Sequence, residues 1–104
     1  MNSSRSNHID ALEMAALLQR ADMPHLLDVR EAIEYHTYNI GGINIPLAQL
    51  PKALNKLDWN KNDEIIVICK VGLRSETAQA ILNQYGYANV RNLTGGIMAL
   101  QKLK

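Results

Sequence analysis

The residue best suited to chemistry is Cys69, the single cysteine among the 104 residues. It follows the apolar run Ile65-Ile66-Val67-Ile68 and begins the segment Cys69-Lys70-Val71-Gly72-Leu73-Arg74-Ser75. One thiol cannot form an intramolecular disulfide, a Cys-x-x-Cys redox pair or a multi-cysteine zinc site. Any covalent intermediate on Cys69 must therefore be resolved by another molecule.

The segment from Cys69 to Ser75 is predicted to join the end of a buried strand to the start of a helix. In such a loop, backbone N–H groups and the positive end of the helix converge on the sulfur. Lys70 and Arg74 add two cations, and Gly72 permits a turn that a side chain would obstruct. These effects favour thiolate over thiol and predict a nucleophile in an anion-binding loop. The alternative is a small buried apolar residue, which would need neither the glycine nor the cations.

The elements that would position this loop alternate between strands and helices. After a helix of about ten residues that follows Asp10, short apolar runs predict strands at 26–29, 43–45, 65–68 and 90–93, with helices between and after them. The run at 65–68 shows no polar alternation, as expected of a central parallel strand buried on both faces. The order predicts an α/β domain with a mostly parallel sheet covered by helices on both faces.

Two helix ends carry local signals. Asp10 and Glu13 have the spacing of a capping box at a helix start. Gly86 stands where the glycine that ends a helix is expected, directly after an apolar stripe of helical spacing. These signals place one helix before the first predicted strand and another after the Cys69 loop.

Asp28 and Arg30 are predicted at the same edge of the sheet as the Cys69 loop. Ligands of parallel sheets bind at the carboxyl ends of the strands, so this edge is the expected site. Both residues could act chemically. At a strand end, an ion pair that braces the active-site loop is the more frequent role.

Composition and charge narrow the class of protein. Apolar residues make up 47% and charged residues 20%, a globular balance for a chain of one-domain length. The net charge of +1 excludes, by bulk charge, a strongly basic nucleic-acid binder. We expect a flexible lead over 1–8, without the apolar core of a secretion signal, and one domain over 9–104. No membrane span is expected, and the cytoplasm is the predicted location. The three histidines lack metal-ligand spacing, so no metal site is expected.

Four segments, in this order, match the motifs of one family. They are Leu27-Asp28-Val29-Arg30 with Glu34-Tyr35; Asn39-Ile40-Gly41-Gly42 followed by Asn44-Ile45-Pro46-Leu47; Cys69-x-x-Gly72-x-Arg74-Ser75; and Asn92-Leu93-x-Gly95-Gly96-Ile97-x-Ala99. Together they resemble a single-domain rhodanese, a thiosulfate sulfurtransferase-type domain. The match extends from Leu26 to Leu100. The resemblance implies a three-layer α/β domain with a mostly parallel five-stranded sheet. Thr37-Tyr38 and Leu100 depart from the family's pattern, away from the nucleophile.

The resemblance implies a persulfide mechanism without a cofactor. Cys69 would take the outer sulfur of a donor such as thiosulfate and pass it to cyanide or a cellular thiol. Backbone N–H groups of the loop would stabilise the anionic persulfide, and Lys70 and Arg74 would help to bind an anionic donor. Ser75 would cap the helix, with its hydroxyl near the persulfide. Lys70, Val71 and Leu73 stand at variable positions of the loop, so they do not identify the donor.

Two other interpretations of the Cys69 loop remain open. A cysteine-based phosphatase or arsenate reductase also uses an anion-binding loop. Here only four residues separate Cys69 from Arg74, one fewer than in tyrosine-phosphatase-type loops, and no second thiol is present. A sulfur-relay or docking module with a protein partner is the non-enzymatic alternative. Rapid sulfur exchange with a desulfurase, but slow turnover of thiosulfate, would favour the relay.

Overall fold

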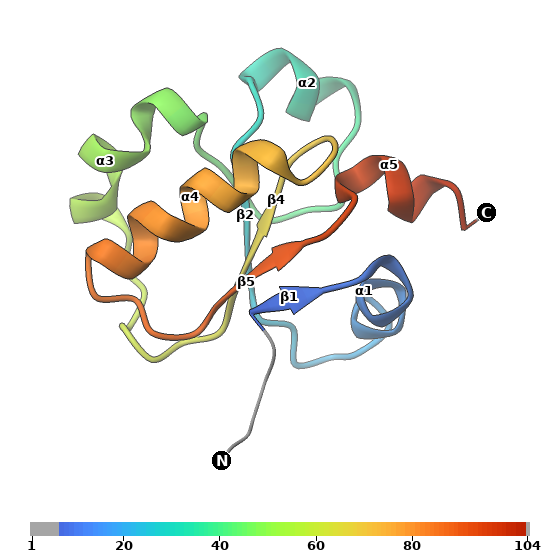
Figure 1. The fold of residues 1–104 in the computed structure, drawn as a ribbon, viewed down its shortest axis with the longest axis horizontal. Coiled ribbons are helices and arrows are strands. Elements are labelled where there is room, and N and C mark those ends of the chain that lie inside the picture. The colour runs from blue at the N-terminus through green and yellow to red at the C-terminus, as the bar shows by residue number, and fades with distance from the viewer. Residues whose placement is uncertain (1–6, 104) are drawn as a thin grey trace.

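The middle layer of the fold is a five-stranded sheet, seen in a computed structural model that describes residues 7–103 (Figure 1). Its strands are β1 (His8–Ile9), β2 (His25–Asp28), β3 (Ile43–Asn44), β4 (Ile65–Ile68) and β5 (Val90–Leu93). The order across the sheet is β1-β5-β4-β2-β3, and every neighbouring pair is parallel. The predicted α/β class and parallel five-stranded sheet are confirmed.

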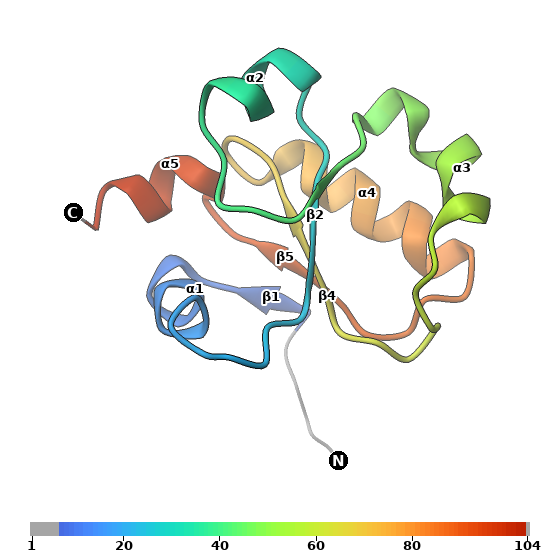
Figure 2. The same cartoon turned by 180° about the vertical axis from the view of Figure 1, so that it is seen from behind.

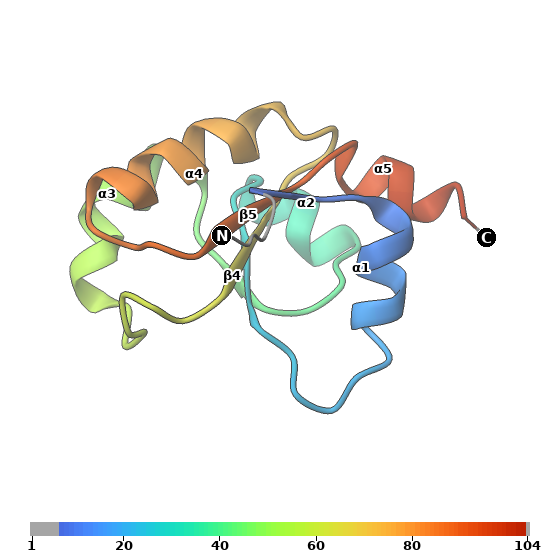
Figure 3. The same cartoon turned by 60° about the horizontal axis from the view of Figure 1, so that its bottom comes forward.

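Helices cover both faces of this sheet (Figures 2 and 3). They are α1 (Ala11–Leu17), α2 (Ala32–Thr37), α3 (Leu50–Ala53), α4 (Leu73–Gln84) and α5 (Gly96–Gln101), with the 3-10 turns η1 (Leu47–Gln49) and η2 (Leu54–Lys56) around α3. Helices α3 and α4 pack on one face, and α1 and α5 pack on the other. Helix α2 lies beside the loop that joins β4 to α4 (Figure 1).

Strand β4 is the centre of the core, and all four of its residues are buried. Ile65 and Val67 belong to the cluster under α3 and α4, whereas Ile66 and Ile68 belong to the cluster under α1 and α5. Side chains of a strand point alternately to opposite faces, and here both faces are covered by helices. This explains why the run shows no polar alternation. The rigid strand holds Cys69 at its carboxyl end.

The local signals for helix ends hold in the structure. The Asp10 carboxylate accepts the Glu13 N–H at 2.8 Å, and the Glu13 carboxylate accepts the Asp10 N–H at 3.1 Å. Gly86 ends α4 with a φ of +96°. The predicted helix of about ten residues after Asp10 is shorter, with seven residues, because the chain tightens into i→i−3 turns after Leu17. Capping therefore fixed where this helix begins but not its length.

Strand β1 is the element that the sequence did not locate. We expected a flexible lead over 1–8, of which residues 1–6 lie outside the described part of the chain. Asn7 accepts the Asn92 N–H at 3.0 Å, and His8 pairs with Asn92 in the sheet register. A two-residue strand has no periodicity to recognise, because its pairing comes entirely from β5. None of the helices between residues 7 and 103 has both the length and the apolar character that crossing a membrane requires.

Candidate active site

Cys69 lies directly after β4, at the carboxyl edge of the sheet, and it is completely buried. Its Sγ accepts the Gly72 N–H at 3.0 Å and the Ser75 N–H at 3.3 Å. The Ser75 hydroxyl lies 3.2 Å from the same sulfur. Backbone N–H groups directed at a sulfur favour its anionic form. The loop thus wraps around the sulfur as the sequence predicts.

Gly72 allows this wrapping. It has a φ of +98°, in the left-handed region, and takes the N-cap position of α4, so Ser75 lies inside the helix and does not cap it as expected. A Cβ at this position would lie 3.1 Å from the Gly95 nitrogen, so space is restricted as well. Glycine adopts this conformation without steric cost, which lets the Gly72 N–H turn toward the sulfur.

Ser75 and Asn92 form a buried polar relay behind the sulfur. The Ser75 hydroxyl donates to Asn92 Oδ1, and Asn92 Nδ2 donates to the Gly72 carbonyl at 3.2 Å. While the Ser75 hydroxyl donates to Asn92, its oxygen can accept a hydrogen bond from the Cys69 thiol. Sequence reasoning gave Asn92 no role in the site. The feature that could have pointed to Asn92 is its polar amide within strand β5, where the fold leaves only 1% of the residue exposed.

The glycine pair at residues 95–96 brings α5 against the catalytic loop. The Ile97 N–H donates to the Cys69 carbonyl at 2.9 Å, and the Met98 N–H donates to the Lys70 carbonyl at 3.1 Å. Gly96 has a φ of +60°, and a Cβ there would lie only 2.5 Å from the Cys69 carbonyl oxygen. The start of α5 therefore fixes the backbone of Cys69 and Lys70.

Arg74 lies at the start of α4 and forms a bidentate ion pair with Glu34 of α2. Its Nη1 and Nη2 donate to the two carboxylate oxygens at 2.8 and 3.0 Å. Glu34 also accepts the Glu31 N–H at 2.9 Å. The hydrogen bonds from Arg74 lower the pKa of Glu34 to about 2, although burial opposes the shift. Glu34 is a site residue that sequence reasoning missed, because its partner is 40 residues away.

Asp28 and Arg30 form the predicted ion pair, and both are almost fully buried. Arg30 Nε and Nη2 donate to the Asp28 carboxylate at 3.0 and 2.8 Å. Arg30 Nη2 also donates to the Tyr38 carbonyl at 2.7 Å, and Asn44 Nδ2 reaches the Asp28 carbonyl at 3.0 Å. Through these bonds the pair braces the connection from α2 to β3, where the sequence had led us to expect that it would brace the Cys69 loop.

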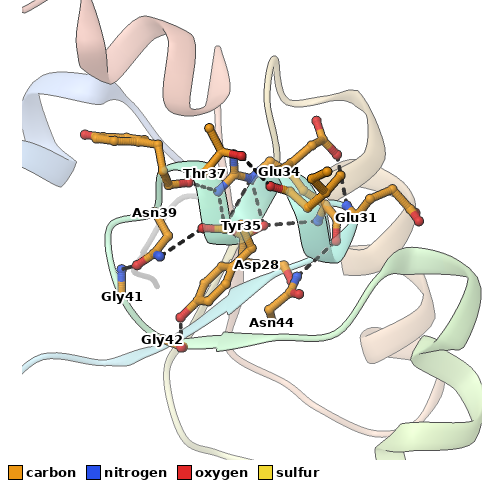
Figure 4. Close-up of polar contacts among 12 residues, drawn as sticks. Asp28, Glu31, Glu34, Tyr35, Thr37, Asn39, Gly41, Gly42 and Asn44 are labelled. Carbon is orange, nitrogen blue, oxygen red and sulfur yellow. Dashed lines mark hydrogen bonds and ion pairs between the residues drawn. The ribbon is translucent and has the colours of Figure 1, made fainter.

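Hydrogen bonds also join residues of that connection to α2 and to one another (Figure 4). The Tyr35 hydroxyl donates to the Gly42 carbonyl at 2.7 Å, and Asn39 Nδ2 donates to the Tyr35 carbonyl at 2.9 Å. The Gly41 N–H donates to Asn39 Oδ1 at 2.9 Å. These bonds hold α2, and with it Glu34, against the sheet edge where Cys69 lies.

A groove of about 330 Å³ opens beside the catalytic loop. Its lining includes Arg30, Ile33, Glu34, Tyr38, Lys70 and Ile97. Lys70 is exposed, and so are Val71 and Leu73 at 47% and 69%. Among residues 7–103, no three side chains of the metal-binding types come together. The groove thus reaches the loop at Lys70.

The comparisons with known proteins agree with this fold. The family profile described as the rhodanese-like domain matches residues 10–103, and the chain belongs to that family. PspE, a thiosulfate sulfurtransferase of Escherichia coli, is 36% identical over 83 residues, which are 77% of this chain and 79% of PspE. The human single-domain sulfurtransferase TSTD1 has the same fold, with a TM-score of 0.85 over 96% of this chain and 99% of its own, at 24% identity.

A third relative is YrkF of Bacillus subtilis, whose name describes it as a candidate sulfur carrier protein. It is 36% identical over 100 residues, which are 92% of this chain. The chain spans about half of YrkF, 53% of its length. The relatives thus include a protein named for catalysis and another named for carrying sulfur.

Proposed function

We propose that this protein is a sulfurtransferase that moves sulfane sulfur from a donor such as thiosulfate, through a persulfide on Cys69, to a thiol or to cyanide. The observation that carries the proposal is the Cys69 sulfur at the end of β4, held by the N–H groups of Gly72 and Ser75. This arrangement suits a sulfur that is anionic both before and after transfer.

The reaction has two balanced steps. The Cys69 thiolate forms a bond to the outer sulfur of thiosulfate, the S–S bond of the donor breaks, and sulfite leaves with the electron pair. Cyanide or a thiolate then attacks the outer sulfur of the persulfide. The S–S bond to Cys69 breaks, the thiolate is regenerated, and thiocyanate or a new persulfide departs. A single nucleophile used twice predicts ping-pong kinetics.

The loop residues have distinct proposed roles. Gly72 and Ser75 donate their backbone N–H groups to the sulfur, and the Ser75 hydroxyl forms a further hydrogen bond with it. Lys70, exposed at the groove, attracts the anionic donor, and Val71 and Leu73 form the exposed rim of the loop. Arg74, the other cation of the loop, supports the site from outside. The ion pair of Asp28 and Arg30 at the end of β2 does the same.

A sulfur-relay role is the second candidate. It is favoured by YrkF, named as a candidate sulfur carrier, and by the exposed apolar rim at Val71 and Leu73. In a relay, a partner protein would deliver or remove the sulfur, and free thiosulfate would turn over slowly. A reducing compartment, such as the cytoplasm, suits both roles because Cys69 must stay a thiol.

Intact-protein mass spectrometry tests the proposal. After incubation with thiosulfate, we expect the mass to rise by one sulfur atom, and cyanide should remove it with release of thiocyanate. The Cys69→Ser variant should gain no sulfur, and its thermal stability should be checked against that of the wild type. A cysteine desulfurase with its substrate is the second donor, and loading from it alone would favour the relay. Failure of the folded wild-type protein to gain sulfur from either donor would contradict the proposal.

A further inference from the structure

The sequence motifs of the site contain three cations, and in the fold two of them form ion pairs with carboxylates. Arg30 is paired with Asp28, which accepts from both Nε and Nη2. Arg74 is paired with Glu34 through two hydrogen bonds. Lys70 is the remaining cation, and it has no ion pair within residues 7–103. The groove therefore offers a donor less positive charge than its sequence suggests.

Arg74 is the loop cation whose charge a neighbouring carboxylate offsets. The hydrogen bonds to Glu34 raise the pKa of Arg74, although burial opposes the shift, and the negative charges of Glu34 and Cys69 add to the rise. The Arg74 side chain is 35% exposed and that of Glu34 is 29% exposed, and the Glu34 side chain lines the groove. Glu34 is also fixed by the Glu31 N–H at 2.9 Å, which holds the carboxylate in place. At neutral pH Glu34 is ionised and offsets Arg74.

We propose that Glu34 is a specificity-determining residue that, by pairing with Arg74, shifts the site away from dianionic and toward monoanionic sulfur donors. This inference rests on the proposed sulfurtransferase function. The donor class is a sulfane sulfur that carries one negative charge, as in an organic persulfide (R–S–S⁻) or a thiosulfonate (R–SO₂–S⁻). The physical reason is that attraction to a fixed charge scales with the charge of the donor.

Thiosulfate and methanethiosulfonate form a matched pair of probes. Both deliver an outer sulfur to Cys69, and the leaving groups are sulfite and methanesulfinate. The first donor is a dianion and the second a monoanion. In Glu34→Gln, one positive charge is freed at the solvent-exposed rim, which should raise kcat/KM for the monoanion about two- to threefold. The dianion should gain the square of that factor, about four- to ninefold.

Three further variants separate charge from structure. Arg74→Gln leaves Glu34 uncompensated, so the ratio of thiosulfate to methanethiosulfonate activity should fall below that of the wild type. The double variant of Glu34→Gln with Arg74→Gln restores the charge balance, so the ratio should return to the wild-type value. Glu76→Gln, an exposed carboxylate on α4, is the matched control and should leave the ratio unchanged. High salt should shrink every difference.

The outcomes distinguish this inference from the function on which it rests. If wild-type Cys69 gains no sulfur from either probe, the sulfurtransferase function fails. If both probes load Cys69 but the ratio in Glu34→Gln equals that of the wild type, the function stands and the role of Glu34 is refuted. A changed ratio that persists in the double variant would also refute it, because a structural effect would then be the cause. Should Glu34→Gln not fold, the fall expected in Arg74→Gln tests the same charge balance.

Discussion

Gly96 is the residue at which a single methyl group should damage both stability and catalysis. Its φ of +60° costs an L-amino acid about 1–2 kcal/mol. An alanine Cβ would also lie 2.5 Å from the Cys69 carbonyl oxygen and would crowd the Lys70 carbonyl group, all of it backbone. Forcing such atoms apart costs about 1–3 kcal/mol. Gly96→Ala should therefore destabilise the fold by about 2–5 kcal/mol.

The displacement falls on the backbone that carries the nucleophile. Because the Ile97 and Met98 N–H groups hold the Cys69 and Lys70 carbonyls, moving α5 should also misalign the loop N–H groups. We expect sulfur transfer by the folded Gly96→Ala protein to fall at least about tenfold, since hydrogen bonds to a charged group contribute about 1.5–3 kcal/mol. Urea unfolding followed by circular dichroism gives the free energy, and thiocyanate release gives the rate.

Gly86 supplies the control for the conformational part of this cost. It has a φ of +96°, but a Cβ there would come no closer than 3.8 Å, to the side chain of Lys61. Gly86→Ala should lose only about 1–2 kcal/mol, with sulfur transfer unchanged. The reasoning is refuted if the two variants lose the same free energy and transfer sulfur equally well.

Three more predictions concern the site and its supports. Ser75→Ala keeps the N–H but removes the hydroxyl 3.2 Å from Sγ, so kcat should fall about tenfold with little change in KM for thiosulfate; an unchanged kcat would count against the relay to Asn92. Arg30→Leu leaves the buried Asp28 carboxylate without its cation, although it still accepts the backbone N–H of residue 30, and should cost about 3–5 kcal/mol in urea unfolding; adding Asp28→Asn should recover part of the loss. Glu34 has a pKa of about 2 in the folded chain against an ordinary 4.5, so its contribution to stability is complete above about pH 4.5 and is lost as the pH falls toward 2. After discounting for solvent screening, that contribution is about 1–2 kcal/mol, and the stability difference between wild type and Glu34→Gln should narrow over this range; a constant difference would disprove it.

Signals that act over a few residues could be predicted without the fold. The capping box at Asp10 and Glu13, the helix-ending Gly86 and the strand after which Cys69 stands are all observed where expected. Each depends on hydrogen bonds or conformations of neighbouring residues. Helix length was less predictable, because the stop after Leu17 depends on packing of the following turn.

Pairings between distant residues could not be predicted. Strand β1 forms only because β5 offers its open side to Asn7 and His8. Asn92 and Ser75 are hydrogen-bonded although 17 positions separate them, and neither residue type by itself predicts the contact. The sequence also places Arg74 beside Cys69 without any sign of its partner, whereas in the fold its Nη1 and Nη2 donate to Glu34, 40 positions away.

The sequence by itself predicted the turn around Cys69, the residue that we propose as nucleophile, and the parallel α/β class. These follow from a lone Cys69, the conformational freedom of Gly72 and an apolar run without alternation. Only the tertiary structure decided how much positive charge the site presents. Charges in a motif add along the chain, but their effect on a donor depends on partners brought from elsewhere, and here α2 brings Glu34 to Arg74.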